Sequence, residues 1–262
     1  MPSLYSCMAS LPQLASKKGK RVYKRKSYYV KFEPKCFNSS YVEKERRRYP
    51  RMEKKLPALI FDLDGTLWDS SKEVAASWSE VASSCLGYDY PITKEKVLSL
   101  MGLVMKDIAL AIAPEGFHEE QAIDFAKACF DHEIEYLWDH PGTPYKGSLE
   151  TLKSLKENGY KLYICSNCQK GYIEDYLHLV GDSLFDDHIC YEDTLSSKDV
   201  SIRRLMERNH IEEAIYIGDT LGDETSAHKA GLPFVYASYG FGKANNPEFI
   251  IKSLSELVSI IK

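Results

Sequence analysis

The stretch Phe61-Asp62-Leu63-Asp64-Gly65-Thr66-Leu67 follows a short apolar run, and its pattern guides the interpretation of the rest of the chain. Side chains two residues apart on a strand point to the same side, so Asp62 and Asp64 are expected to be neighbours. Two such carboxylates are costly unless a cation lies between them or they share a proton. Carboxylate oxygens are the ligands that Mg²⁺ prefers, so a divalent cation meets that need. Gly65 permits a tight turn and can present its amide to an anion.

Downstream of this stretch, short apolar runs alternate with helical patterns. The runs predict buried parallel strands at 58–63, 161–166, 188–191, 214–217 and 233–237. The helical patterns lie at 148–158 with Ser148 as cap and Gly159 as stop, at 199–209, at 224–230 closed by Gly231, and after a capping box formed by Ser253 and Glu256. This alternation predicts an α/β fold with a doubly wound, Rossmann-like parallel sheet. Such sheets bind ligands at the carboxyl ends of their strands.

Residues 70–144 interrupt the alternation with helical spacing of apolar residues and no clear strand. We therefore expect a small α-helical cap at 70–144, inserted into a catalytic core made of residues 53–69 and 145–262. The aromatic side chains of the insertion, among them Trp78, Phe125 and Tyr136, are expected to serve internal packing.

Polar residues also follow two later apolar runs, and a lysine stands near the start of a predicted helix. Ser166 and Asn167 follow the second run, where a hydroxyl and an amide can hold phosphoryl oxygens. Lys198 stands near the start of a predicted helix, where its charge could neutralise a phosphoryl group. Asp219 and Asp223 follow the fourth run and would complete an oxygen cage for one Mg²⁺. Each signal is weak by itself, since such residues also occur in ordinary turns and on surfaces.

These four features, in this order and at these strand ends, resemble the haloacid dehalogenase-like hydrolase superfamily, over residues 57–262. The segment 159–167 and the motif around Asp219 are similar to its phosphoglycolate phosphatase branch. The resemblance implies that Asp62 is the nucleophile, that Asp64 is the general acid and then base, and that Ser166 and Lys198 hold the phosphoryl group. It also implies phosphate binding by Gly65, Thr66 and Asn167. It implies Mg²⁺ binding by Asp62, the backbone carbonyl of Asp64 and Asp219, with Asp223 supporting the ion directly or through water.

The expected function is therefore Mg²⁺-dependent hydrolysis of a small phosphomonoester, phosphoglycolate-like, through an aspartyl-phosphate. An acid at Asp64 favours a phosphatase over a dehalogenase, because an alkoxide leaving group needs a proton and a halide does not. One departure from the family pattern is Asp199, where proline often follows the lysine.

Several other functions are compatible with the sequence. A sugar phosphomutase of the beta-phosphoglucomutase type, a pyrophosphatase and a nucleotidase share the same machinery. A catalytically idle binding protein is a further alternative, against which the intact set of acidic residues argues. The spacing of Cys165 and Cys168 also matches a redox or half-zinc motif, but no second cysteine pair accompanies it.

Charge is distributed unevenly along the chain. Residues 1–55 contain 16 Lys and Arg against 4 Glu, whereas the remainder contains 18 basic and 34 acidic side chains. We interpret 1–52 as a basic extension outside the fold, with Met52 as an alternative start; a nucleic-acid- or lipid-binding tail and a transit peptide are the competing interpretations. The absence of a signal peptide and of a long apolar run predicts a cytoplasmic protein without a membrane partner, for which nucleic acid is not the expected ligand.

Overall fold

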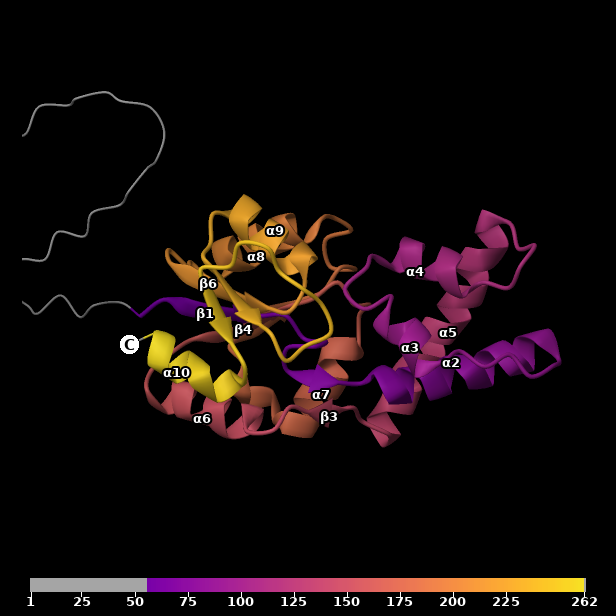
Figure 1. Cartoon of the computed structure of the whole chain (residues 1–262), viewed down its shortest axis with the longest axis horizontal. Coiled ribbons are helices and arrows are strands. Elements are labelled where there is room, and N and C mark those ends of the chain that lie inside the picture. Colours follow the sequence, from indigo (N-terminus) through magenta and orange to yellow (C-terminus); the bar gives the residue numbers. More distant parts are fainter. Residues whose placement is uncertain (1–55, 262) are drawn as a thin grey trace, which may run out of the picture. The chain divides into compact units, whose positions relative to one another are not determined.

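The computed structural model describes residues 56–261, in which a parallel sheet of six strands forms the core (Figure 1). The strands run in the order β5-β4-β1-β6-β7-β8. Their bounds are β1 Ala58–Phe61, β4 Leu162–Cys165, β5 Asp187–Ile189, β6 Ala214–Gly218, β7 Phe234–Ala237 and β8 Phe249–Ile251. The central strand β1 pairs with β4 and β6, so that Leu59 lies opposite Leu162 and Ile215. This arrangement confirms the predicted α/β fold.

Alternate residues of β1 point to opposite faces of the sheet, and each face has its own helical layer. Leu59 and Phe61 belong to the cluster that contains Leu152 of α6 (Ser148–Glu157) and residues of α7 (Tyr172–Val180). Ile60 belongs to the cluster with residues of α8 (Lys198–Arg208) and α9 (Leu221–Ala230). Figure 1 shows α8 and α9 on one face, with α6 and the terminal helix α10 (Leu257–Ile260) on the other. The polar residues that follow β1, β4 and β6 are therefore held at one edge of a sheet whose central strands are buried.

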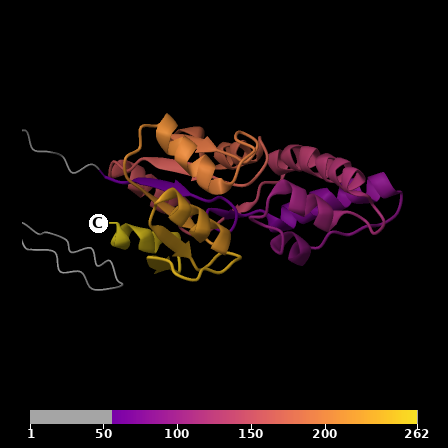
Figure 2. The ribbon, with the colours of Figure 1, turned by 90° about the horizontal axis from the view of Figure 1, so that it is seen from above.

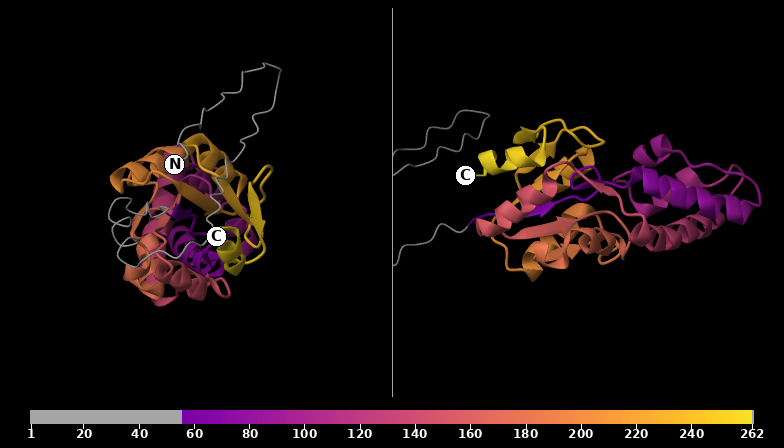
Figure 3. Two further views of the ribbon diagram at one scale, coloured as in Figure 1. Left: turned by 90° about the vertical axis from the view of Figure 1, so that its left-hand side faces the viewer. Right: turned by 90° about the horizontal axis from the view of Figure 1, so that it is seen from below.

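Four helices occupy the segment between β2 (Trp68–Asp69) and β3 (Thr143–Pro144), which confirms the helical character predicted for the insertion. They are α2 Ser71–Leu86, α3 Lys94–Leu98, α4 Met105–Ile112 and α5 Glu119–Asp139. Figures 2 and 3 show these helices grouped beyond the sheet. In their core the rings of Trp78 and Phe130 meet edge to face at a centroid distance of 5.7 Å.

The insertion leaves the core and returns to it through adjacent residues. Strands β2 and β3 are antiparallel, with Trp68 opposite Pro144 and Asp69 opposite Thr143. Gly142 makes this approach possible, because a Cβ atom there would lie 2.8 Å from Ser70 Cα. The two crossings thus form one narrow connection between the insertion and the sheet.

Local details differ from the sequence-based predictions at several ends. Helix α6 is preceded by Gly147 in the left-handed region, and Ser148 is its first residue rather than its cap. The predicted capping box is wrong: Glu256 accepts from the amide of Lys252, and a short 3₁₀ turn, Leu254–Glu256, precedes α10. Strand β8 and the pair β2–β3 were not predicted.

No helix within residues 56–261 is long and apolar enough to cross a membrane. The interpretations of residues 1–52 concern residues outside the described part of the chain.

Candidate active site

The loop after β1 carries Asp62, whose side chain is buried beside Lys198. The ammonium of Lys198 donates to Asp62 Oδ1 at 2.8 Å and to Asp223 Oδ1 at 2.7 Å. Burial by itself lowers the pKa of Lys198, but Asp223 and Asp62 outweigh it and raise that pKa. Lys198, at the start of α8, is therefore a fixed positive charge that joins the end of β1 to the first turn of α9. Asp199, which follows it, turns away to bind Ser197 and Arg203.

Asp62, Asp219 and Asp223 form a buried group of carboxylates with ligand atoms within 4.8 Å of one another. Burial and the neighbouring Asp223 raise the pKa of Asp62 and raise that of Asp219 to about 7. When ionised, the three carboxylates carry three negative charges, and Lys198 supplies one positive charge. Two further positive charges would make the group neutral. An all-oxygen donor set with this charge fits Mg²⁺. The side chain of Asp64 lies outside this group, and the Mg²⁺ role given to its backbone carbonyl stays a prediction.

Asp219 is held by a loop that the sequence analysis missed. Its Oδ2 accepts from the amides of Phe241 at 2.7 Å and Gly242 at 3.2 Å. A Cβ at Gly240 would lie 2.4 Å from Asp219 Cβ, and one at Gly65 would lie 2.2 Å from its carboxylate. Two glycines soon after a strand were the available signal, since they allow backbone to approach a side chain closely. The carboxylate is thus oriented by two backbone segments.

Asp223 is oriented by the first turn of α9. Its Oδ2 accepts from the amide and hydroxyl of Thr220, and its own amide donates to Thr220 Oγ1. This reciprocal capping leaves Oδ1 for Lys198.

Asp64 lies in a different environment from Asp62. Its Oδ1 accepts three hydrogen bonds, from Tyr172 at 2.8 Å and from Ser70 and Trp68 at 3.1 Å each. Burial raises the pKa of Asp64 to about 6, and these three hydrogen bonds oppose the rise. Its carboxyl group can therefore hold and release a proton near neutral pH. Sequence reasoning missed all three donors.

The structure places the predicted phosphate ligands in different settings. The amide of Gly65 donates to the carbonyl of Trp68 at 3.0 Å and so closes a turn instead of facing an anion. The hydroxyl of Thr66 donates to Asp219 Oδ1 at 3.4 Å. Asn167 donates to the carbonyl of Gly102 in the insertion at 2.9 Å. Phosphate binding by Thr66 and Asn167 stays a prediction.

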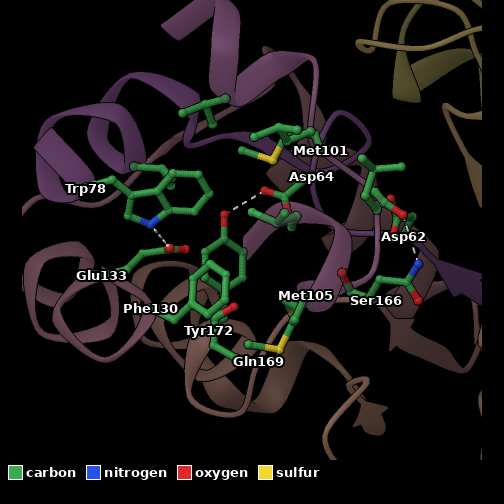
Figure 4. A pocket seen from close by; sticks show the side chains of 18 residues that line it. Asp62, Asp64, Trp78, Met101, Met105, Phe130, Glu133, Ser166, Gln169 and Tyr172 are labelled. Atoms are coloured by element: carbon green, nitrogen blue, oxygen red, sulfur yellow. Dashed lines mark hydrogen bonds between the residues drawn. The ribbon is translucent and has the colours of Figure 1, made fainter. Parts of the chain in front are cut away.

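A pocket opens between these residues and the insertion (Figure 4). Asp62, Asp64 and Ser166 line it on the side of the sheet. Figure 4 shows Trp78 and Glu133 at the other end, with Asp64 and Tyr172 between. Trp78 therefore lines the pocket as well as packing on Phe130, which corrects the expectation that it serves packing only. Phe125 packs on Phe117, as expected of an internal residue.

Comparisons with known proteins agree with this geometry. Residues 59–237 match the family described as haloacid dehalogenase-like hydrolase. A phosphoglycolate phosphatase of Rhodobacter capsulatus is 31% identical over 201 residues, which cover 71% of this chain and 86% of that protein. A phosphoglycolate phosphatase of Aquifex aeolicus is 29% identical over 212 residues, which cover 78% of this chain and 95% of that protein.

Solved structures give the same result. The crystal structure of a predicted phosphatase from Clostridium acetobutylicum is 26% identical and superposes with a TM-score of 0.65, over 79% of this chain and 98% of that chain. The resemblance drawn from the sequence motifs is thereby confirmed. The chain belongs to the haloacid dehalogenase-like hydrolase family.

Proposed function

We propose that this enzyme hydrolyses small phosphate monoesters through a phosphate covalently bound to Asp62. The observation that carries the proposal is the contrast between two neighbouring carboxyl groups. Asp62 contacts Lys198 within the group of buried carboxylates, whereas Asp64 contacts three neutral donors and has a pKa of about 6. One side chain is placed to attack and the other to exchange a proton.

The buried carboxylates fit a magnesium ion. Asp62, Asp219 and Asp223 would hold it, together with the backbone carbonyl of Asp64 that the family resemblance implies. When bound, the ion would supply positive charge that stabilises the phosphoryl group during transfer.

In the first step, a carboxylate oxygen of Asp62 forms a bond to phosphorus while the bond from phosphorus to the ester oxygen breaks. Asp64, in its protonated form, gives its proton to the departing oxygen, so the product leaves as an alcohol. Lys198 favours the ionised form of Asp62 and orients it, since it donates to Oδ1 and leaves Oδ2 for the attack.

In the second step, Asp64 is ionised and takes a proton from water as the water oxygen attacks phosphorus. The bond between phosphorus and Asp62 breaks, phosphate leaves, and the carboxylate of Asp62 is restored. Tyr172, Ser70 and Trp68 all bind Oδ1 of Asp64, so Oδ2 is the oxygen left for the proton. The same group thus serves both steps.

The names of the relatives make phosphoglycolate the first ester to assay. We further place the enzyme in the cytoplasm, because the five cysteines of the described chain are all unpaired.

The roles of the two aspartates are tested by Asp62→Asn and Asp64→Asn with nitrophenyl phosphate. Nitrophenolate leaves with little need of a proton, so Asp64→Asn should form the covalent intermediate and stall at its hydrolysis. We expect a burst of nitrophenol near one per site, then turnover reduced by about 10²–10⁴-fold. Asp62→Asn should give no burst. Retained turnover in Asp62→Asn, or a lack of trapped phosphate in acid-quenched Asp64→Asn, would refute the assignment.

A further inference from the structure

The pocket has two chemically different ends. At the sheet, Asp62, Asp64 and Ser166 surround the place where the phosphoryl group must sit for attack by Asp62. The other end belongs to the insertion and holds the alcohol part of the ester, since that part points away from the nucleophile. Figure 4 shows Trp78 and Glu133 at this end. The side chains that line it decide which alcohol the enzyme accepts.

The alcohol end is largely apolar. Its lining from the insertion consists, apart from Gly102 and Glu133, of apolar side chains: Val74, Trp78, Val97, Leu100, Met101, Leu103, Met105, Ile108 and Phe130. No lysine, arginine or histidine of the described chain lines the pocket. Lys198 is already bound to Asp62 and Asp223 beneath its floor. An anionic group on the alcohol would therefore enter without a cationic partner.

One acidic side chain, that of Glu133, lines the alcohol end of the pocket. Glu133 is 3% exposed, lies on α5, and accepts from the indole N–H of Trp78. Burial raises the pKa of Glu133 to about 8, against the opposing effect of Trp78 and Gln169. The side chain is consequently a neutral carboxylic acid at pH 7, with an O–H to donate and an oxygen to accept. This is the chemistry of a hydroxyl receptor.

Gln169 adds a second polar group at the same place. Its side chain lines the pocket, is 9% exposed and lies near Glu133. Its side-chain amide interacts with the carboxyl group of Glu133 and lowers the pKa of that group. Glu133 and Gln169 together offer a donor and acceptors to one bound group.

We infer that this phosphatase prefers esters whose alcohol is uncharged, with apolar carbon atoms and a hydroxyl that binds Glu133 and Gln169, and that it discriminates against alcohols bearing a carboxylate. The inference rests on the proposed function and narrows its substrate class. It predicts weak activity on phosphoglycolate itself, in spite of the names of the relatives.

The physical reason is the cost of burying charge. A buried carboxylate costs several kcal/mol unless a cation pairs with it, whereas a hydroxyl needs only its hydrogen bonds. A second carboxylate beside Glu133 would also keep Glu133 protonated and leave one negative charge in an apolar chamber. A hydroxyl would bind Glu133 and Gln169, which both line the pocket, without adding charge.

The decisive comparison uses two esters of nearly the same shape. Phosphoglycolate carries a carboxylate where 2-hydroxyethyl phosphate carries a hydroxymethyl group. The same difference separates 3-phosphoglycerate from glycerol 3-phosphate, which form a larger pair. We expect kcat/KM to favour the neutral member at least about tenfold, since each 1.4 kcal/mol corresponds to a factor of ten. Equal or greater activity on the acidic member of either pair would overturn the inference.

A variant that adds the missing cation gives the opposite test. Leu103 lines the pocket and is 41% exposed, so Leu103→Arg can place a charge at the rim without a buried cavity. Leu110 on α4 is 47% exposed and does not line the pocket, so Leu110→Arg is the matched control. The first change should raise activity on phosphoglycolate relative to hydroxyethyl phosphate by about two- to fivefold, the range for half-exposed ion pairs. Equal effects of both changes would count against the inference.

The hydroxyl receptor is tested with ethyl phosphate, which lacks the hydroxyl. Glu133→Met should reduce the preference for hydroxyethyl over ethyl phosphate, and Gln169→Met provides a second variant in case the first does not fold. Unchanged preference in folded forms of both variants would remove Glu133 and Gln169 from the receptor.

Nitrophenyl phosphate separates the two levels of the argument. If the wild-type enzyme did not hydrolyse nitrophenyl phosphate, the proposed function would be refuted. Hydrolysis of nitrophenyl phosphate together with no turnover of either neutral ester would refute only the inference about the alcohol.

Discussion

Burial raises the pKa of Asp64, and three donors on one of its oxygens oppose that rise; Tyr172 is the closest of them. A hydrogen bond to a carboxylate favours its ionised form, so removal of the Tyr172 hydroxyl should raise the pKa of Asp64 above about 6. Hydrolysis of the covalent intermediate needs ionised Asp64. With nitrophenyl phosphate, the acidic limb of kcat should therefore move to higher pH in Tyr172→Phe, and a pH–rate profile measures the midpoint.

Tyr176→Phe is the control for this experiment. Tyr176 is buried against Trp68, and its hydroxyl has no partner within the described residues. Its loss should leave the midpoint where it is. If Tyr172→Phe also leaves it unchanged, Tyr172 has only a structural role.

Asp219 gives a second prediction for a single residue. Mutation of a residue that only hydrogen-bonds to a metal ligand typically lowers metal affinity about 10–100-fold. Loss of the ligand Asp219 itself should therefore lower the Mg²⁺ affinity by at least this factor. We expect Asp219→Ala to need correspondingly more Mg²⁺ for activity, and Asp131→Ala, an exposed aspartate on α5, to match the wild type. A magnesium titration checks both.

Ca²⁺ should inhibit the enzyme, because the looser coordination geometry of Ca²⁺ would let the nucleophilic carboxylate of Asp62 bind the ion through both oxygens. Full activity after exhaustive chelation would contradict the metal assignment.

At the scale of elements, the narrow connection formed by β2 and β3 links the insertion to Asp64. Ser70, which donates to Asp64, lies against Gly142, where an added Cβ would be 2.8 Å from Ser70 Cα. Gly142→Ala should therefore displace Ser70, lower kcat and reduce the free energy of unfolding by about 1–3 kcal/mol, the usual cost of overpacking.

Gly116→Ala separates the two effects. A Cβ at Gly116 meets nothing within 4 Å, but its φ of 90° makes alanine strained there. This variant should lose some stability and keep its kcat. An unchanged kcat in Gly142→Ala, measured at saturating substrate, would show that the connection does not position Asp64.

The elements also show how far sequence reasoning reaches. Apolar runs of four or more residues predicted β1, β4, β6 and β7, because a strand buried on both faces leaves that pattern. Asp62, Lys198, Asp219 and Asp223 were found for a related reason, since each follows such a run or opens a helix. The donors to Asp64 and the loop at Asp219 were not found. Tyr172 is 108 residues from Asp64 in sequence, and a backbone amide carries no residue-specific signal.

At the scale of the whole molecule, we expect that the basic residues 1–51 can be removed without loss of stability or activity. Every element described here lies within residues 56–261, and these residues contain the complete set of site residues. A protein starting at Met52 should therefore match the full-length chain in melting temperature and in turnover of nitrophenyl phosphate. A loss of several degrees or of most activity would give the first 51 residues a part in the fold.

The side-by-side crossings of the insertion have an evolutionary consequence. A segment whose two ends lie side by side can be replaced without interrupting the sheet. The insertion is joined to the core only through the short antiparallel pair of β2 and β3, in which Trp68 lies opposite Pro144. Recombination at these two points would exchange one recognition module for another and leave the reaction chemistry intact. The same junction is a natural graft site, where a designer could install a different chamber over the same pair of aspartates.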